Sequence, residues 1–160
     1  MDIKVKKICM KVRNDFVTNS SSSSFILGFN NADEIADIIA RELPSYWSED
    51  AINEVISNIK EGITSKEEAI DLYKDSIDYY WWRFNGKSYW DMTIEELRSK
   101  EWLDYKTNRI NELVRDCEEE LEKYNVISIV EYEDHSKFGS EMEHDIMPDL
   151  DSTIYRISHH

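Results

Sequence analysis

Histidines and carboxylates gather in the last quarter of the chain, where they could bind a metal or transfer protons. They are His135, Glu141, Glu143, His144, Asp145, His159 and His160. Imidazole and carboxylate groups together suit zinc or another divalent transition metal. No two histidines have the His-x-x-x-His spacing with which one helix binds a metal, so the ligands would have to come from separate strands. We therefore expect His144 to pack in a sheet and His135 to titrate in solvent, with no metal and no cofactor bound.

The expected strands limit which histidines could share an ion. If the C-terminal strands form an antiparallel meander, His135 and His159 lie at opposite ends of it, roughly 20 Å apart at about 3.3 Å per residue. His144 could then join only one of them, with Glu143 as a further ligand if a bulge turns it inward. The sequence leaves open whether His159 and His160 are native or the remnant of an affinity tag.

A run of five serines stands between two apolar segments, Phe16-Val17 and Phe25-Ile26-Leu27. This pattern predicts a hydroxyl-rich connection between two strands, and a solvated hairpin loop is its simplest interpretation. The alternatives are an anion-binding nest, a phosphorylation site, or a nucleophilic serine served by a histidine base. Together with the C-terminal cluster, the candidate ligand-binding residues are Asn19, Ser20, Ser21, Ser22, Ser23, Ser24, Glu143, His144 and His159.

A dense aromatic stretch occupies the middle of the chain, from Tyr79 to Phe84, with Tyr89 and Trp90 after it. Adjacent residues diverge by about 100° on a helix, so one buried stripe cannot easily hold two neighbouring tryptophans. A half-exposed Trp beside an Arg is typical of the centre of a protein interface. The alternative is that the second tryptophan lies under the loop that follows. The candidate interface residues are Trp81, Trp82, Arg83 and Trp90.

The formal net charge is −15, and it is unevenly spread. Residues 1–13 carry +4 from five bases and one acid, whereas residues 31–92 carry −8 from 14 acids and six bases. Residues 131–151 carry −7 from eight acids and one base. This field disfavours nucleic acid, and we expect no nucleic-acid partner, because phosphate neutralisation needs clustered Lys and Arg. It would suit a basic protein partner or a cation, although acidity also serves solubility alone.

The length of 160 residues predicts a single domain, 1–160, large enough to bury a core without disulfides. Its apolar runs are too short to span a membrane, and no apolar stretch follows the basic N-terminus as in a secretory signal. We expect a cytoplasmic protein in which Cys9 and Cys117 are free, buried thiols. The oligomeric state is left open.

Periodicity predicts strands at both ends of the chain and helices between them. An N-terminal hairpin, 1–29, would pair a bulged strand with a strand at 25–29, and the serines would connect the two. The helical segment, 31–124, contains expected helices at 31–43, 49–61, 66–84 and 93–123. The sequence does not decide whether the last of these is one helix or two that meet near Lys100.

The C-terminal part, 126–160, reads as three strands at 126–132, 141–146 and 153–158. The middle one is inferred because a structureless loop of about twenty residues is unusual, and because Met142, His144 and Ile146 alternate with acids. Grouped strands and helices favour the α+β class. We expect a mixed or antiparallel sheet from both chain ends, with the helical segment packed on one face.

The serine run belongs to a longer motif, Arg13-x-x-Phe16-Val17-Thr18-Asn19 followed by Ser20 to Ser24 and Phe25. This motif resembles the N-terminal signature of a group of uncharacterised bacterial and phage proteins. A looser similarity covers residues 139–144 and 157–160. The group has no established activity, so the resemblance implies no catalytic residues.

These patterns support two classes of function. The first is an acidic, non-enzymatic protein that binds a protein partner, as the charge, the aromatic stretch and the lack of a recognisable catalytic motif indicate. The second is a small enzyme or ligand-binding domain whose site joins the Ser20–Ser24 loop to the C-terminal His/Glu cluster. The second requires the serines, Glu143, His144 and His159 to converge in one cleft.

Overall fold

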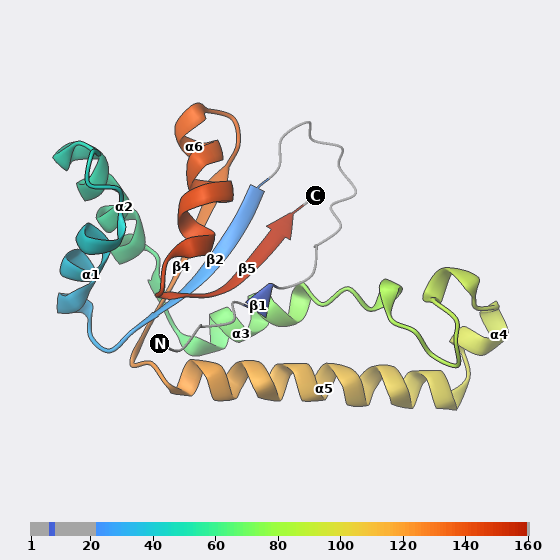
Figure 1. The fold of residues 1–160 in the computed structure, drawn as a ribbon. Helices are drawn as coiled ribbons and strands as arrows, with labels where there is room; N and C mark the ends of the chain where they lie inside the picture. The colour runs from blue at the N-terminus through green and yellow to red at the C-terminus, as the bar shows by residue number, and fades with distance from the viewer. Residues whose placement is uncertain (1–6, 9–21, 160) are drawn as a thin grey trace.

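A five-stranded sheet forms the centre of the protein, whose computed structural model describes residues 7–8 and 22–159 (Figure 1). The strand order is β1-β5-β2-β4-β3. The strands are β1 (Lys7–Ile8), β2 (Ser22–Phe29), β3 (Ile63–Thr64), β4 (Val126–Glu133) and β5 (Thr153–His159). β2 is antiparallel to both β4 and β5, and β1 pairs with β5 in parallel. The sheet is thus mixed and joins both ends of the chain, as the sequence predicts.

Strand β2 lies in the middle of this sheet and is buried on both faces. Phe25, Leu27 and Phe29 belong to one apolar core, whereas Ile26 belongs to the other. Side chains alternate between the two faces of a strand, so β2 needs apolar cover on both sides.

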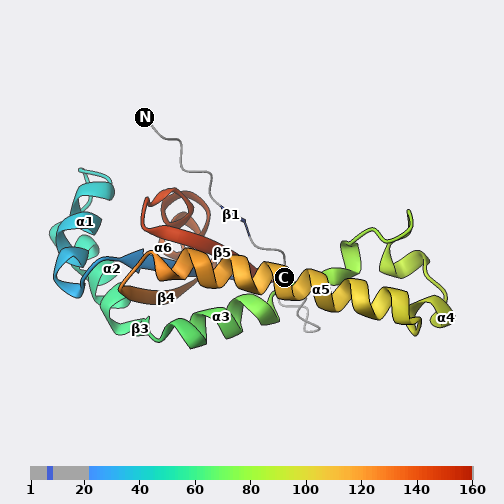
Figure 2. The same ribbon diagram turned by 90° about the horizontal axis from the view of Figure 1, so that it is seen from below.

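Helices cover both faces of the sheet (Figures 1 and 2). One core contains residues of α1 (Ile35–Glu42) and α2 (Glu49–Glu61), and α6 (Lys137–Glu141) lies over the same face. The other core contains residues of α3 (Lys66–Asp75) and α5 (Lys100–Glu122). The α+β class is confirmed, but the helical segment divides between the two faces, because one layer could not cover a strand that is apolar on both. Among the described helices, none combines the length and apolar character needed to cross a membrane.

The N-terminal strands differ from the expected hairpin. β1 pairs with β5 and not with β2. Ser22 to Ser24 are the first residues of β2 and are not part of a connection; Ser23 pairs with Tyr132 of β4 and with Ser158 of β5. The polar run can enter the sheet because side chains from other elements bond its buried hydroxyls.

The segment 141–146, expected as a strand, is helical. α6 continues into a π-helical turn, Met142–Ile146, and a 3-10 turn, Met147–Asp149. The two buried methionines, Met142 and Met147, are five residues apart. This separation equals that of the residues joined by a π-helical hydrogen bond, and it matches neither the two-residue period of a strand nor the 3.6-residue period of an α-helix. The expected meander is therefore wrong, and β2 separates β4 from β5.

Two of the expected helices are shorter than their periodicity indicates. α3 stops at Asp75, where the Ser76 hydroxyl donates to the Tyr73 carbonyl oxygen at 2.5 Å and Asp78 caps the next 3-10 turn, Tyr79–Trp81. The expected 93–123 helix is two helices, α4 (Ile94–Leu97) and α5. Ser99 caps α5, and Thr93 and Glu96 form a capping box at the start of α4.

The N-terminal half of α5 extends beyond the sheet (Figures 1 and 2). The helix has 23 residues and is about 34 Å long at 1.5 Å per residue. The chain before it, including the 3-10 turns Tyr79–Trp81 and Tyr89–Asp91, lies beside these first turns. We call residues 77–106 the aromatic arm.

The burial of the central strand can be tested by its effect on stability. Phe25 is fully buried in β2, so Phe25→Ala should lower the free energy of unfolding by about 3–5 kcal/mol, through lost burial and a cavity. Urea denaturation followed by circular dichroism measures this change. Tyr46→Ala is the control, because Tyr46 is 80% exposed and its loss should cost under about 0.5 kcal/mol. A loss below about 1 kcal/mol for Phe25→Ala would contradict the two-sided burial of β2. Phe16, on the other side of the serine run, lies outside the described residues.

Candidate functional site

Strand β2 divides the candidate serines between the two faces of the sheet. Ser23 lies on the same face as Phe25, below α6, and Ser24 lies on the opposite face with Ile26. Both serines are buried, and Ser22 is half-buried. The described part of the serine run therefore does not form a single loop site. Asn19, Ser20 and Ser21 lie outside the described residues.

Five polar side chains converge on the α6 face, and we call them the Glu143 cluster: Ser23, Asp134, Glu143, His144 and Arg156. Glu143 is fully buried at its centre. Ser23 Oγ donates to Glu143 Oε1 at 3.0 Å, and Arg156 Nη2 lies 3.9 Å from the same oxygen. Arg156 Nε also donates to Ser23 Oγ at 3.3 Å. The inner side of the cluster is thus a hydrogen-bonded network that satisfies a buried carboxylate.

The outer side of the cluster faces solvent. His144 Nε2 lies 3.6 Å from Glu143 Oε2 and 4.0 Å from Asp134 Oδ2. The side chains of His144 and Asp134 are 44% and 28% exposed, against 0% for Glu143. One carboxylate oxygen therefore points into the protein, while the other faces two side chains that a small ion could reach.

A close approach between α6 and β4 positions this cluster. A Cβ on Gly139 would lie 2.0 Å from the carbonyl oxygen of Glu133, so glycine is required at the contact. Ser136 fixes the start of α6 by accepting a hydrogen bond from the backbone nitrogen of Gly139 at 3.0 Å. The π-helical turn that follows then brings Glu143 and His144 beside Asp134, the residue directly after β4.

A second polar pair lies on the opposite face, where Ser24 Oγ is 2.8 Å from His159 Nε2. A serine and an imidazole at this distance have the geometry of a nucleophile and its base. However, Ser24 is 4% exposed in the middle of the sheet, where a substrate carbonyl has no access. We assign the pair a structural role, the satisfaction of a buried hydroxyl.

The candidate residues therefore come together only in part. Ser23, Glu143 and His144 meet on one face, while Ser24 and His159 meet on the other, so the single cleft that the enzyme hypothesis requires is not formed by these residues.

His135 lies outside the cluster, exposed at the surface, where its Nε2 is 2.6 Å from Glu133 Oε2. Sequence reasoning missed Asp134 and Arg156. Arg156 could have been found, because it is the one charged side chain other than histidine in β5.

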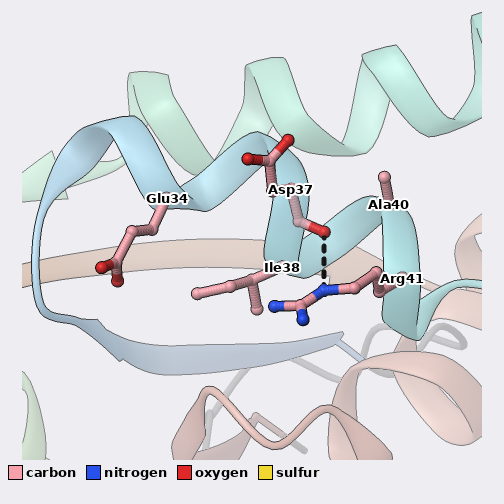
Figure 3. Close-up of a pocket in the computed structure, with 5 residues that line it drawn as sticks. All are labelled: Glu34, Asp37, Ile38, Ala40 and Arg41. Carbon is pink, nitrogen blue, oxygen red and sulfur yellow. Dashed lines mark hydrogen bonds between the residues drawn. The ribbon is translucent and has the colours of Figure 1, made fainter.

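An open hollow of about 670 Å³ on the surface of α1 contains none of the candidate residues. Its lining residues are Glu34, Asp37, Ile38, Ala40 and Arg41 (Figure 3). Arg41 Nε donates to the Asp37 carbonyl oxygen at 3.3 Å, the dashed line in the figure. These residues belong to one helix and the turn before it, and they are not polar groups converging from several elements, so we assign no site there.

The candidate interface tryptophans occupy different environments on the aromatic arm. Trp81 is 69% exposed and Trp90 is 53% exposed. Trp82 is half-buried, with its ring centroid 6.3 Å from that of Tyr105 in α5. Trp90 stacks on Tyr80 with centroids 5.4 Å apart and planes 22° apart. The arm therefore half-buries Trp82 and exposes Trp81.

Arg83, the fourth candidate, stabilises a tight turn of the arm. Phe84 and Lys87 exchange two backbone hydrogen bonds of 2.9 and 3.0 Å around Asn85 and Gly86. Both central residues have positive φ, 51° and 77°, which suits Asn-Gly. Arg83 Nη1 donates to the Gly86 carbonyl oxygen at 3.0 Å. The guanidinium thus closes the turn, which begins three residues after the exposed Trp81.

Tyrosine packing on the arm changes the acidity of one phenol. The hydrogen bond between the Tyr79 and Tyr80 hydroxyls, 3.4 Å long, raises the pKa of Tyr79 to about 12, with burial and the neighbouring phenols and Asp78 acting in the same direction.

Comparison of the chain with protein-family models, with curated proteins and with solved structures gives no match. Function is therefore argued from the geometry of the Glu143 cluster and of the aromatic arm.

The interaction between Arg156 and Glu143 can be tested with a double mutant. Arg156→Ala removes the cation beside a buried carboxylate and should cost about 3 kcal/mol of unfolding free energy. Combined with Glu143→Gln, the same change should cost clearly less than the sum of the two single changes, because no carboxylate is left uncompensated. Chemical denaturation measures all three variants, with the exposed Arg41→Ala as control. Additive losses would show that the two side chains do not interact.

The raised pKa of Tyr79 can be tested by titration with base. Its folded-state pKa of about 12 is above the usual value of about 10, so the protonated phenol stabilises the arm fully below pH 10 and less as pH rises toward 12. The difference in tyrosinate absorbance between the wild type and Tyr79→Phe isolates this residue, and we expect a midpoint near 12. Tyr80→Phe removes the hydrogen-bond partner and should lower that midpoint. A wild-type midpoint near 10 would mean that the Tyr79–Tyr80 contact is absent in solution.

Proposed function

We propose that this chain is a cytoplasmic, non-enzymatic protein-binding module whose aromatic arm binds a basic segment of a protein partner. The observation that carries the proposal is the exposure of Trp81 and Trp90, 69% and 53%, on an arm that extends away from the sheet. Tryptophans dominate binding energy at the centres of interfaces, because they combine a large apolar area with a polar N–H group.

Apolar exposure is concentrated on this arm. Six large hydrophobic side chains are exposed in the described part of the chain, and four of them belong to residues 77–106: Trp81, Trp90, Ile94 and Leu103. The other two, Tyr46 and Ile63, lie outside the arm. Concentrated apolar exposure on a surface element marks an interaction site more often than scattered single residues do.

The arm is supported from beneath, so its shape exists before a partner binds. Tyr80 contacts both Tyr89 and Trp90, with ring centroids 4.7 and 5.4 Å apart. Deeper in the arm, Phe84 packs on Trp102, which is 2% exposed. Rigid aromatic anchors lose little conformational entropy on binding, which raises affinity for a given contact area.

Charge favours a basic partner. The protein carries a formal net charge of −15. The arm itself is close to neutral, with six acids and five bases in residues 77–106, so the attraction comes from the charge of the rest of the protein. A Lys- or Arg-rich segment is attracted by this field, and its cations can lie over the tryptophan faces.

The experiment compares three baits in extracts of the native host: the wild type, a Trp81→Ala/Trp90→Ala variant and Tyr46→Ala. We expect a basic protein that the wild type and Tyr46→Ala retain and that the double variant loses. Titration of the recovered, purified protein should then show at least about a tenfold loss of affinity for each single tryptophan variant, as for hot-spot residues, and weaker binding at higher salt.

Tyr46→Ala is the matched control, because it removes an aromatic ring that is 80% exposed and lies outside the arm. Retention of the same proteins by all three baits would contradict the proposal. A concentration-dependent dimer of the wild type in sedimentation that is absent in the double variant would also contradict the proposal, because the arm would then bind a second copy of this chain.

A further inference from the structure

We propose that Asp134, Glu143 and His144 form a site for one divalent transition-metal ion, independent of the aromatic arm. One ligand atom from each of these residues lies within 4.8 Å of the other two. One imidazole nitrogen and two carboxylate oxygens are the donors that zinc and its neighbours accept. The sequence predicts no metal here because no helical histidine pair is present and because Glu143 could join His144 only through a bulge in the expected strand. The π-helical turn brings the two side chains together without a bulge.

The distances are close to those of a coordinated ion. Ligands about 2.0–2.1 Å from a tetrahedral metal lie roughly 3.3 Å apart from one another. His144 Nε2 is 3.6 Å from Glu143 Oε2 and 4.0 Å from Asp134 Oδ2. Closure around an ion therefore needs side-chain shifts of about 1 Å. The partly exposed His144 and Asp134 can make those shifts, while the buried Glu143 stays in place.

The inner network supplies the support that metal ligands require. Glu143 binds Ser23 and approaches Arg156 through Oε1, which leaves Oε2 directed toward His144. Hydrogen bonds to the oxygen of a ligating carboxylate that does not bind the metal fix the orientation of the carboxylate. They commonly change metal affinity 10–100-fold. The cluster contains one guanidinium and two carboxylates, so it keeps a net negative charge that attracts a cation.

The exposure of the cluster indicates an open coordination sphere. Three protein ligands leave a fourth tetrahedral position, and the 44% exposed side chain of His144 places that position toward solvent. Structural zinc sites are closed by four protein ligands, whereas sites that bind water or an exchangeable ligand have three. The site should therefore bind its ion reversibly and exchange a ligand with solvent.

Zinc binding to the full chain tests the proposal. After removal of metal with a chelator, Zn²⁺ is titrated by calorimetry against the wild type, His144→Ala, Asp134→Asn and the control His135→Gln. We expect one Zn²⁺ per chain in the wild type and in His135→Gln, and at least a tenfold loss of affinity in the other two. His135 is the matched control, because it is an exposed histidine near the cluster but outside it.

A second metal and a second variant exclude two simpler explanations: metal binding that does not involve His144, and metal binding by the two C-terminal histidines. Co²⁺ should give visible d–d absorption bands that His144→Ala abolishes, while the far-ultraviolet circular dichroism of that variant stays unchanged. A His159→Gln/His160→Gln variant should retain the zinc stoichiometry. The proposal is overturned if the wild type shows no saturable binding, if His144→Ala binds as tightly as the wild type, or if binding is lost with the two C-terminal histidines.

Discussion

The burial of β2 on both faces is the constraint on which the rest of the structure depends. A strand that is covered on both sides must satisfy every polar group that it carries inward. Its first three residues are serines, and each of the two buried ones bonds a side chain on its own face: Ser23 bonds Glu143, and Ser24 lies beside His159. A flanking helical turn and a neighbouring strand are thereby tied to the central strand by hydrogen bonds as well as by apolar contact.

This arrangement separates the two surfaces for which we propose functions. The Glu143 cluster lies where α6 and its π-helical turn cross the sheet, while the aromatic arm lies beyond the sheet at the N-terminal end of α5 (Figure 1). The arm has no sheet to cover, so its rings pack on one another and on α5, and Trp81 and Trp90 stay exposed. A protein-binding surface and a cation site can thus coexist without sharing a residue.

Much of the fold was predictable, because long elements with strong periodicity leave clear patterns. β4, β5, α1 and α2 follow such patterns, and the Ser48 cap of α2 is a local signal. The pairing of β1 was not predictable, because a short strand carries no information about its neighbour. The π-helical turn was missed because Met142 to Ile146 alternate like a strand. For the same reason the proximity of Asp134 to Glu143 was hidden, although Ser136 and Gly139 mark the start of a helix there.

Hydrogen exchange followed by mass spectrometry tests the central role of β2 most directly. If β2 is the doubly covered centre of the fold, the backbone amides of Phe25 to Phe29 exchange more slowly than those of any other segment, at the rate set by global unfolding. The amides of the turn at Asn85 and Gly86, on the arm, exchange much faster. Exchange of the β2 amides as fast as that of the turn would contradict the account, because the central strand would then open without unfolding the protein.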